Sequence, residues 1–310
     1  MTSPKARPSG APGTFETMDS RGRVAIVGAG RVGTAMSGLL SSRGYTVTGV
    51  ADPSEFARQR AAALSGAEPD ADPAAAAAGA DIILITTPDD KIGETCGLIA
   101  FSGRDLSGKK FIHMSGALSL EALDAARQAG ADVLSIHPLQ TFADLEGALA
   151  ALPGSAFGVT CEPEMEEWAE RFVSDLDGRT QFIADSDKVL YHAAAVLASN
   201  VLAMVEYAAE SVARELGFSD EGFLAAFMPL ARATLDNVAR LGPLHALTGP
   251  LARGDAGTIK QHLQALQTFN SDLAAMYRSA CLWGLRLVEE RGDVEPGVIE
   301  EMRNLLGSDP

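Results

Sequence analysis

A glycine-rich turn between a strand and a helix constrains this chain more than any other feature. Residues 23–30, RVAIVGAG, form a short β-branched run, and residues 31–44 follow it with a helical pattern. The turn has the spacing Gly-x-Gly-x-x-Gly. Gly28 permits the tight turn, Gly30 lets the backbone approach a pyrophosphate, and Gly33 allows close packing of helix on strand. Because the N–H groups at the helix start face the phosphates, the turn predicts a dinucleotide site.

Strands and helices alternate through the first half of the chain. Further strands are expected at residues 45–52, 80–88, 109–116, 131–138, 155–161 and 179–185. Helices are expected at residues 55–64, 119–130 and 162–176, and the low-complexity run 73–78 is expected to be a loop and helix cap. Buried strands that alternate with helices are typical of a parallel sheet covered on both faces. The pattern predicts an α/β, doubly wound domain of the Rossmann type.

The cofactor expected in this domain is NADP or NAD. Asp52 ends the second strand, where an acidic group holds the ribose hydroxyls of NAD and repels a 2′-phosphate. Ser54 and Arg58 follow and could cradle that phosphate instead, and Asp52 could serve only as a turn residue before Pro53. The residues expected to bind the cofactor are Gly28, Ala29, Gly30, Arg31, Val32, Gly33, Asp52, Ser54, Thr87 and Pro88.

Polar residues follow the expected strands where a nicotinamide and its substrate would lie. Ligands of open α/β sheets bind outside the carboxyl ends of the strands. Ser115 and Gly116 offer a hydroxyl and backbone N–H groups there, and Gln140 is a further substrate candidate. His137 could donate a hydrogen bond or a proton near neutral pH. The alternatives are that Ser115 is a turn residue and that His137 caps a loop.

The second half of the chain is helical in pattern. Residues 187–217 are expected to form one helix, followed by helices near 221–241, 256–266, 270–291 and 296–306. At 100° per residue, a polar stripe runs along the first of them, formed by Lys188, His192, Ser199 and Glu206. A buried lysine can donate a proton or polarise a carbonyl oxygen. Lys188 and His192 are therefore catalytic candidates unless the stripe faces solvent, and Asn200 lies off it as a substrate candidate.

A glycine-rich loop at residues 247–258 leads into a later helix. Arg253 could pair with a substrate carboxylate, or form an ion pair with Asp255. Thr258 and the N–H groups at the helix start could bind an anion. His262 lies one turn further on the same face.

Composition and net charge limit the expected binding partners and the expected cellular location. The net charge of −16 disfavours nucleic acid and anionic lipid. Three separated cysteines show no metal-ligand spacing, so no metal is expected and a reducing cytoplasm is the simplest location. Residues 1–21 have the composition of a disordered leader rather than of a secretory signal. No apolar run is expected to reach the roughly 20 residues that a membrane helix needs.

Several motifs together resemble a known bacterial family. These are GAGRVG, TTPDD, HMSGALS and HPLQTF, then KVLYHAAAVLASN and LTGPLARGDAGTIKQHLQAL. From residue 23 to residue 291 the chain is similar to Rossmann-like proteins with a C-terminal helical domain of unknown function. That family resembles pyrroline-5-carboxylate reductase, ketopantoate reductase and the 3-hydroxyisobutyrate dehydrogenases, whose helical domain is of the 6-phosphogluconate-dehydrogenase type. The resemblance implies a catalytic lysine near the start of the first long helix, which matches Lys188, although the lysine-to-asparagine spacing of those relatives is not reproduced.

These observations lead to one main hypothesis and two alternatives. The main one is an NAD(P)H-dependent reductase of a small carboxylate-bearing 2-oxo acid, such as ketopantoate. The alternatives are a reductase of cyclic imines and a dinucleotide-binding sensor without catalysis. We expect a leader at residues 1–21, a Rossmann domain at 22–186 and a substrate and dimerisation domain at 187–310. The long apolar helix predicts a homodimer formed through the helical domain.

Overall fold

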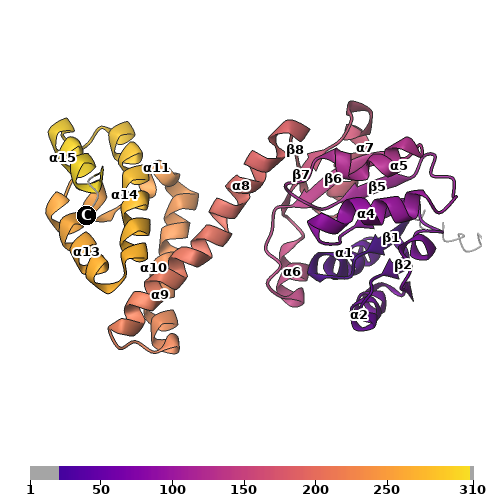
Figure 1. Ribbon diagram of the computed structural model, residues 1–310, viewed down its shortest axis with the longest axis horizontal. Helices are drawn as coiled ribbons and strands as arrows, with labels where there is room; N and C mark the ends of the chain where they lie inside the picture. Colours follow the sequence, from indigo (N-terminus) through magenta and orange to yellow (C-terminus); the bar gives the residue numbers. More distant parts are fainter. Residues whose placement is uncertain (1–20, 308–310) are drawn as a thin grey trace, which may run out of the picture. The chain divides into compact units, whose positions relative to one another are not determined.

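The computed structural model describes residues 21–307 and forms two compact units. The first unit ends at Asn200 and the second begins at Val201 (Figure 1). The expected leader lies outside the described residues, apart from Arg21. The first unit therefore includes one helix beyond residue 186, where the sequence pattern put the end of the Rossmann domain.

The described part of the first unit is built on one eight-stranded sheet with the strand order β3-β2-β1-β4-β5-β6-β7-β8. The strands are β1 Arg23–Val27, β2 Thr46–Ala51, β3 Glu68–Asp70, β4 Ile82–Ile85, β5 Lys110–His113, β6 Asp132–Pro138, β7 Ala156–Thr160 and β8 Arg179–Phe182. The short edge strand β3 was not expected. The reversal of strand order beside β1 creates the crevice in which doubly wound folds bind their ligands.

The sheet is parallel except at one pairing. Strands β6 and β7 run antiparallel, with His137 opposite Gly158, so the expected parallel sheet is corrected there. Between them lies α6, Leu145–Ala151, a helix of seven residues. Strand β7 starts beside the end of β6 and runs back along it, with Pro138 opposite Phe157.

Helices cover both faces of the sheet and are held there by alternating strand residues. Val24 and Ile26 of β1 pack into one apolar core, and Ala25 and Val27 pack into the other. The first core is covered by α1 Arg31–Ser42, α2 Glu55–Ser65, α6 and α7 Glu166–Asp175. The second is covered by α3 Pro73–Ala76, α4 Asp89–Ala100 and α5 Asp124–Gln128. Short 3₁₀ turns occupy Leu120–Leu123, Pro163–Met165 and Asp185–Asp187.

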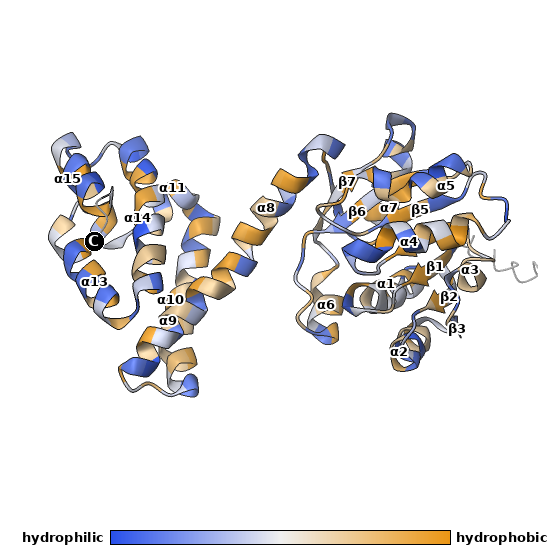
Figure 2. Ribbon diagram, in the orientation of Figure 1, coloured by the Kyte–Doolittle hydropathy of each residue, from blue (hydrophilic) through white to orange (hydrophobic). Residues whose placement is uncertain are grey.

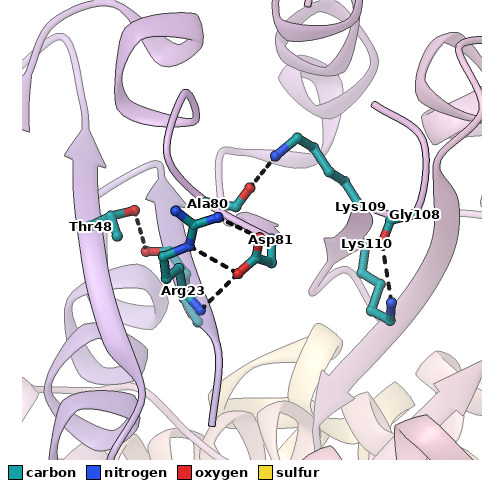
Figure 3. A network of polar contacts seen from close by, with 8 residues as sticks. Arg23, Thr48, Ala80, Asp81, Gly108, Lys109 and Lys110 are labelled. Atoms are coloured by element: carbon teal, nitrogen blue, oxygen red, sulfur yellow. Dashed lines mark hydrogen bonds and ion pairs between the residues drawn. The ribbon is translucent and has the colours of Figure 1, made fainter. Parts of the chain in front are cut away.

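Polar side chains at the amino ends of the strands tie neighbouring strands together (Figure 3). Arg23 donates two side-chain hydrogen bonds to Asp81, at 3.1 and 2.8 Å. The hydrogen bond from Arg23 is the largest of the influences that lower the pKa of Asp81. Both side chains are about half exposed, so this ion pair contributes little to stability. These contacts connect β1 to the residue that precedes β4.

The helix expected at residues 187–217 is interrupted. Helix α8 covers Lys188–Ala198 and α9 covers Asn200–Glu215, and Ser199 between them has φ −124° and ψ −71°. The segment Asp185–Glu215 is long and apolar enough to cross a membrane, by length and composition only. This corrects the expectation that no apolar run has the length of a membrane helix. Nothing in its most apolar stretch is buried, and Figure 2 colours much of α8 and α9 as hydrophobic. One helix of this kind is weak evidence for a membrane span.

The second unit is helical throughout its regular structure. After α9 its helices are α10 Asp220–Leu241, α11 Pro243–Ala246, α12 Gly249–Ala252, α13 Ala256–Phe269, α14 Ser271–Arg291 and α15 Pro296–Gly307. Helices α12 to α15 share an apolar core that includes Ile259, Leu285 and Met302. By contrast, α10 buries only Phe223 among its residues, and large apolar side chains such as Leu230 remain exposed.

Candidate functional site

The glycine turn has the geometry that a pyrophosphate requires. Gly28 has φ +102°, and a Cβ there would lie 2.6 Å from the Thr87 backbone nitrogen. A Cβ on Gly33 would lie 1.9 Å from the carbonyl oxygen of Gly28, so helix and turn touch. Gly30, by contrast, has open space where its Cβ would be, and it begins α1 without a side-chain cap. The first N–H groups of α1 are therefore available to an anion.

A cavity of about 620 Å³ opens beside this turn. Its walls include Gly28, Gly30, Asp52, Thr87 and Pro88, all expected to bind the cofactor. The Thr87 hydroxyl is buried and has no hydrogen-bond partner among the described residues. An orphaned buried hydroxyl and an open glycine cradle on the same walls fit the binding of a dinucleotide.

The Asp52 carboxylate stabilises the glycine turn by hydrogen bonding and also lines the cavity. Its Oδ2 accepts a hydrogen bond from the Ala29 N–H and its Oδ1 accepts one from the Ser54 N–H, both at 2.8 Å. The expected role as a turn residue and the expected role as a cofactor ligand are thus compatible, since a carboxylate has further acceptor sites. Ser54 caps α2 by accepting from the Ala57 N–H, and Arg58 donates to the carbonyls of Asp52 and Pro53.

Two predicted cofactor residues contribute in other ways. Arg31 is exposed and donates to the carbonyl of Phe142, at 3.2 Å. Val32 is half-buried and packs against the apolar core. Both lie in the first turn of α1, but neither is on the cavity wall.

Lys188 lies in a buried polar network at the carboxyl ends of β5 and β6. Its Nζ donates to the hydroxyl of Ser135 at 2.6 Å and to the carbonyl of Ser115 at 3.3 Å, and the residue is only 2% exposed. The Ser115 hydroxyl donates to Asp89 at 2.8 Å and accepts from the N–H groups of residues 117 and 118. Burial lowers the pKa of Lys188 to about 8, against the opposing effects of Asp185 and Asp89.

The network includes two residues that the sequence singled out, Lys188 and Ser115, and two that it did not. Lys188 does not face solvent, which was the alternative for its stripe. The hydroxyl of Ser115 is used within its own turn, as the turn-residue alternative holds. Asp89 and Ser135 were not singled out, although Asp89 follows directly on the expected strand end at Pro88. Ser135 lies inside β6, where an isolated serine gives no signal of its partner.

Two histidines meet above Gly116. The rings of His137 and His192 pack edge to face with centroids 5.7 Å apart. A Cβ on Gly116 would lie 2.6 Å from His192 Cδ2 and 3.0 Å from His137 Nε2, so only glycine leaves room for both rings. His137 Nδ1 lies 3.0 Å from the hydroxyl of Tyr191. Tyr191 is a further candidate that the sequence reasoning missed.

These side chains line a second cavity of about 480 Å³. His137, Tyr191 and His192 form one part of its wall, and Gln140 and Asn200 also contribute. Gln140 is already engaged, since its amide nitrogen donates to the Ala151 carbonyl and its oxygen accepts from the Thr141 N–H. Alanine side chains of α8 supply much of the remaining wall, which suits a small ligand with an aliphatic body.

A contact path joins the two cavities at the carboxyl edge of the sheet. Pro88 lines the first cavity, and the next residue, Asp89, accepts the hydrogen bond from Ser115. Gly116 follows Ser115 and faces His137 and His192, which line the second cavity. The predicted residues Thr87, Pro88, Ser115, Gly116, His137, Lys188 and His192 are therefore brought together within the first unit.

Three predicted substrate residues belong to the second unit. Thr258 donates its N–H and its hydroxyl to Asp255, at 2.9 and 2.7 Å, so the expected anion-binding groups are already used. The hydrogen bonds from Thr258 are the main reason why the pKa of Asp255 is lowered. His262 Nδ1 lies 3.0 Å from the hydroxyl of Tyr277, and Arg253 follows α12. Their role in substrate binding stays a prediction. Among the residues in the structure, no cluster suited to a metal is found.

Two domain families match the chain. A family model of the Rossmann-like domain matches residues 6–138, and a domain of unknown function, DUF2520, matches residues 155–282. No curated protein matches the sequence.

Solved structures of similar architecture span nearly the whole chain. The Bacteroides fragilis protein BF3122 is 20% identical with a TM-score of 0.71, covering 84% of this chain and 96% of its own. An imine reductase from Pseudomonas is 18% identical with a TM-score of 0.61, covering 92% and 99%. Pyrroline carboxylate reductase from Plasmodium falciparum, with NADP bound, is 13% identical with a TM-score of 0.58, covering 93% and 99%. At these identities the likeness establishes the fold.

The sequence resemblance and the observed architecture agree with these matches. The glycine turn and strands β1 to β6 fall within the first domain family, whereas strands β7 and β8 and most of the segment from α8 to α14 fall within the second. This chain carries a Rossmann-like domain followed by a DUF2520 domain.

Proposed function

We propose that the protein is an NAD(P)H-dependent reductase of a small 2-oxo acid that carries a carboxylate, with ketopantoate as an example. The observation that carries the proposal is the pairing of two cavities at one edge of the sheet. One has an open glycine cradle, and the other is lined by His137 and His192. Such a pairing supports a cofactor in the first cavity and a small second ligand in the other.

The chemistry of the chain's own groups fits this reaction. When bound, the nicotinamide would supply a hydride to the carbonyl carbon. Lys188 places a positive charge directly behind the Ser115 carbonyl, and two of its three N–H donors are used by Ser115 and Ser135. A charge held there stabilises negative charge that develops on a substrate oxygen. His192 lies on the wall of the second cavity, where it can transfer a proton to that oxygen.

We propose NAD rather than NADP as the cofactor. Asp52 lines the cavity with its carboxylate fixed by two backbone N–H groups. Two guanidinium groups of α2 each use one nitrogen on the backbone near this carboxylate. Arg58 donates to the carbonyls of Asp52 and Pro53, and Arg60 to the carbonyl of Ala29. A 2′-phosphate at this point would meet the fixed negative charge of Asp52.

The reduction of a cyclic imine is the second candidate within enzymes. It is favoured by the likeness to an imine reductase and to pyrroline carboxylate reductase. An iminium substrate arrives already protonated, so removal of the Lys188 amine should then change turnover little. A dinucleotide sensor without catalysis would bind cofactor and turn over no substrate.

The proposed enzyme is a cytoplasmic homodimer that takes a small carboxylate substrate. All three cysteines are free, which suits a reducing compartment. Val189, Leu190 and Leu197 of α8 are each at least 65% exposed. A second copy is the proposed occupant of this apolar surface, in place of lipid, because the net charge of −16 opposes an anionic membrane. Sedimentation should show a dimer at micromolar concentration, and a monomer would contradict this part of the proposal.

Turnover of a substrate panel tests the proposed reaction. The purified full chain would be given NADH or NADPH with ketopantoate, other short 2-oxo acids and cyclic imines, and loss of reduced cofactor would be followed by absorbance. We expect oxidation of NADH with at least one 2-oxo acid. Turnover of imines alone would transfer support to the second candidate, and cofactor binding without any turnover would favour the sensor.

A further inference from the structure

We propose that Tyr191 is a positioning residue that fixes His137 as a neutral imidazole with its proton on Nε2, so that His137 donates a hydrogen bond to the substrate carbonyl oxygen. The inference rests on the proposed function, because it assigns a role within the reduction of a carbonyl. It concerns a tyrosine that carries no sequence motif and a histidine whose two ring nitrogens have different surroundings.

The fold places Tyr191 so that it reaches one nitrogen of His137. Tyr191 lies on the first turns of α8, and its hydroxyl is 3.0 Å from His137 Nδ1. The phenol lies over Gly158, which is the residue opposite His137 in the antiparallel pairing of β6 with β7. A Cβ on Gly158 would lie 2.5 Å from the tyrosine oxygen. The glycine on β7 is therefore what allows the phenol to approach the imidazole.

The direction of this hydrogen bond follows from the neighbours of each group. Burial raises the pKa of Tyr191, so the phenol keeps its proton at neutral pH. The backbone of Gly158 lowers this pKa, but its effect is smaller than that of burial. Among the described residues, His137 Nδ1 is the group within hydrogen-bond distance of the phenol, so the phenol proton is donated to Nδ1. His137 is neutral, because burial, followed by the charges of His192 and Lys188, lowers its pKa to about 4. A neutral imidazole that accepts at Nδ1 carries its proton on Nε2.

The groups that face His137 from other elements do not reverse this assignment. From α8 they are Tyr191, His192 and Lys188, and from β5 the buried His113, whose pKa is lowered to about 3. None of these is a carboxylate that would favour an imidazolium. The carboxylate of Asp89 accepts a hydrogen bond from the Ser115 hydroxyl, and Gly116 separates Ser115 from His137 along the contact path.

The second ring nitrogen of His137, Nε2, has different surroundings from Nδ1. Nε2 lies next to Gly116, where a Cβ would be only 3.0 Å away, and His137 lines the second cavity. No described residue accepts a hydrogen bond from Nε2. The N–H is thus available to a ligand at the place where Gly116 and His192 meet.

The tautomer decides whether His137 helps or hinders the reaction. An Nε2–H group polarises a carbonyl oxygen and stabilises the negative charge that develops there, without giving up its proton. The opposite tautomer would present a lone pair to the same oxygen and repel it. Because neutral His137 does not transfer a proton, the proton must come from another group, such as His192 or Lys188.

The protonated nitrogen can be observed directly in the full chain. The protein would be labelled with ring-¹⁵N histidine, and the proton-bearing nitrogen identified by NMR near neutral pH. The chain has five histidines, so His137 can be assigned by its loss in the His137→Gln variant. We expect a neutral ring with its proton on Nε2. A proton on Nδ1, or an imidazolium at neutral pH, would overturn the inference whatever the enzyme reduces.

Kinetics of matched variants test the consequence. Glutamine places an amide N–H close to the position of Nε2, whereas asparagine places one close to Nδ1. Loss of one hydrogen bond to a developing oxyanion costs about 10²-fold in kcat. We expect His137→Asn to lose about that factor, His137→Gln about tenfold less, and Tyr191→Phe about tenfold in kcat with little change in KM.

A control variant separates positioning from general loss of a buried hydroxyl. Tyr45 is 6% exposed and donates to Asp175 at 2.8 Å, and it lies on neither ligand cavity. Tyr45→Phe should lower stability at least as much as Tyr191→Phe, because its hydroxyl donates to a carboxylate, and should leave kcat unchanged. Equal kcat in Tyr191→Phe and wild type, or equal losses in the two His137 variants, would refute the role. Absence of all turnover would refute the proposed function, and the NMR result would still decide the tautomer.

Discussion

Replacement of Lys188 by methionine gives the sharpest physical prediction. Methionine keeps the aliphatic stem and removes a charge that is almost wholly buried. The pKa of Lys188 is lowered from 10.5 to about 8, chiefly by burial. At about 1.4 kcal/mol per pKa unit, this corresponds to roughly 3 kcal/mol by which the fold disfavours the charged amine.

The sign of the pH dependence follows from proton binding in the two states. Between pH 8 and 10.5 the unfolded chain keeps the proton of Lys188 while the folded chain loses it. Stability contributed by this residue therefore rises with pH through that window, and the burial cost is fully present below about pH 8. Relative to Lys188→Met, the wild type should gain roughly 3 kcal/mol from neutral pH to pH 10.5.

Urea unfolding of the first unit measures this difference. The chain has two tryptophans, and a Trp283→Phe background leaves Trp168 of α7 to report on the sheet domain. Other titrating groups are common to both proteins, so their effects cancel in the difference. A difference that does not change with pH, or one in which the wild type loses relative stability at high pH, would refute the reasoning. It would show that Asp89 and Asp185 compensate the buried charge fully. If Lys188 also serves catalysis, the stable variant should lose turnover.

Three further predictions follow from the same geometry. Asp52→Asn should reduce the preference for NADH over NADPH by about tenfold, measured as the ratio of their dissociation constants, because one repulsive charge is removed. Gly33→Ala should destabilise the first unit by several kcal/mol or prevent soluble expression, since its Cβ would overlap the Gly28 oxygen, and a normal melting temperature would contradict this. Stability should fall as pH is lowered below about 6.5, because the pKa of buried His113 is depressed to about 3 by burial and by Lys188, and His113→Gln should flatten that dependence in a melting-temperature series.

Most strands and helices of the Rossmann-like domain could be predicted from the sequence, because the signals that specify them are local. A strand followed by Gly28, Gly30 and Gly33 fixes a turn, and alternating apolar runs fix the strands around it. Lys188 could be found for a related reason, since a lysine at the start of an apolar helix conflicts with its surroundings unless it is paired. Ser135, its partner, could not be found, because strand β6 and helix α8 meet only in three dimensions.

The remaining differences between the sequence prediction and the structure arise where tertiary contacts determine the backbone or the side-chain partners. The antiparallel direction of β7 places Gly158 opposite His137, and no local sequence pattern specifies that pairing. Without that register, no pattern connects Tyr191 with His137. The interruption at Ser199 has no glycine or proline to mark it. The occupied hydroxyl of Thr258 likewise reflects a cap by Asp255, which a search for anion sites overlooks.

Binding of nicotinamide dinucleotide at the glycine turn is the central claim, and a titration tests it most directly. Fluorescence titration with NADH and NADPH would compare wild type with Gly30→Ala and Gly79→Ala. Both glycines have open space at the Cβ position and neither has a positive φ, but only Gly30 lines the cofactor cavity. We expect saturable NADH binding in wild type and Gly79→Ala, and a loss of at least tenfold in Gly30→Ala with an unchanged melting temperature. Absence of binding in wild type, or equal affinity in all three proteins, would contradict the account.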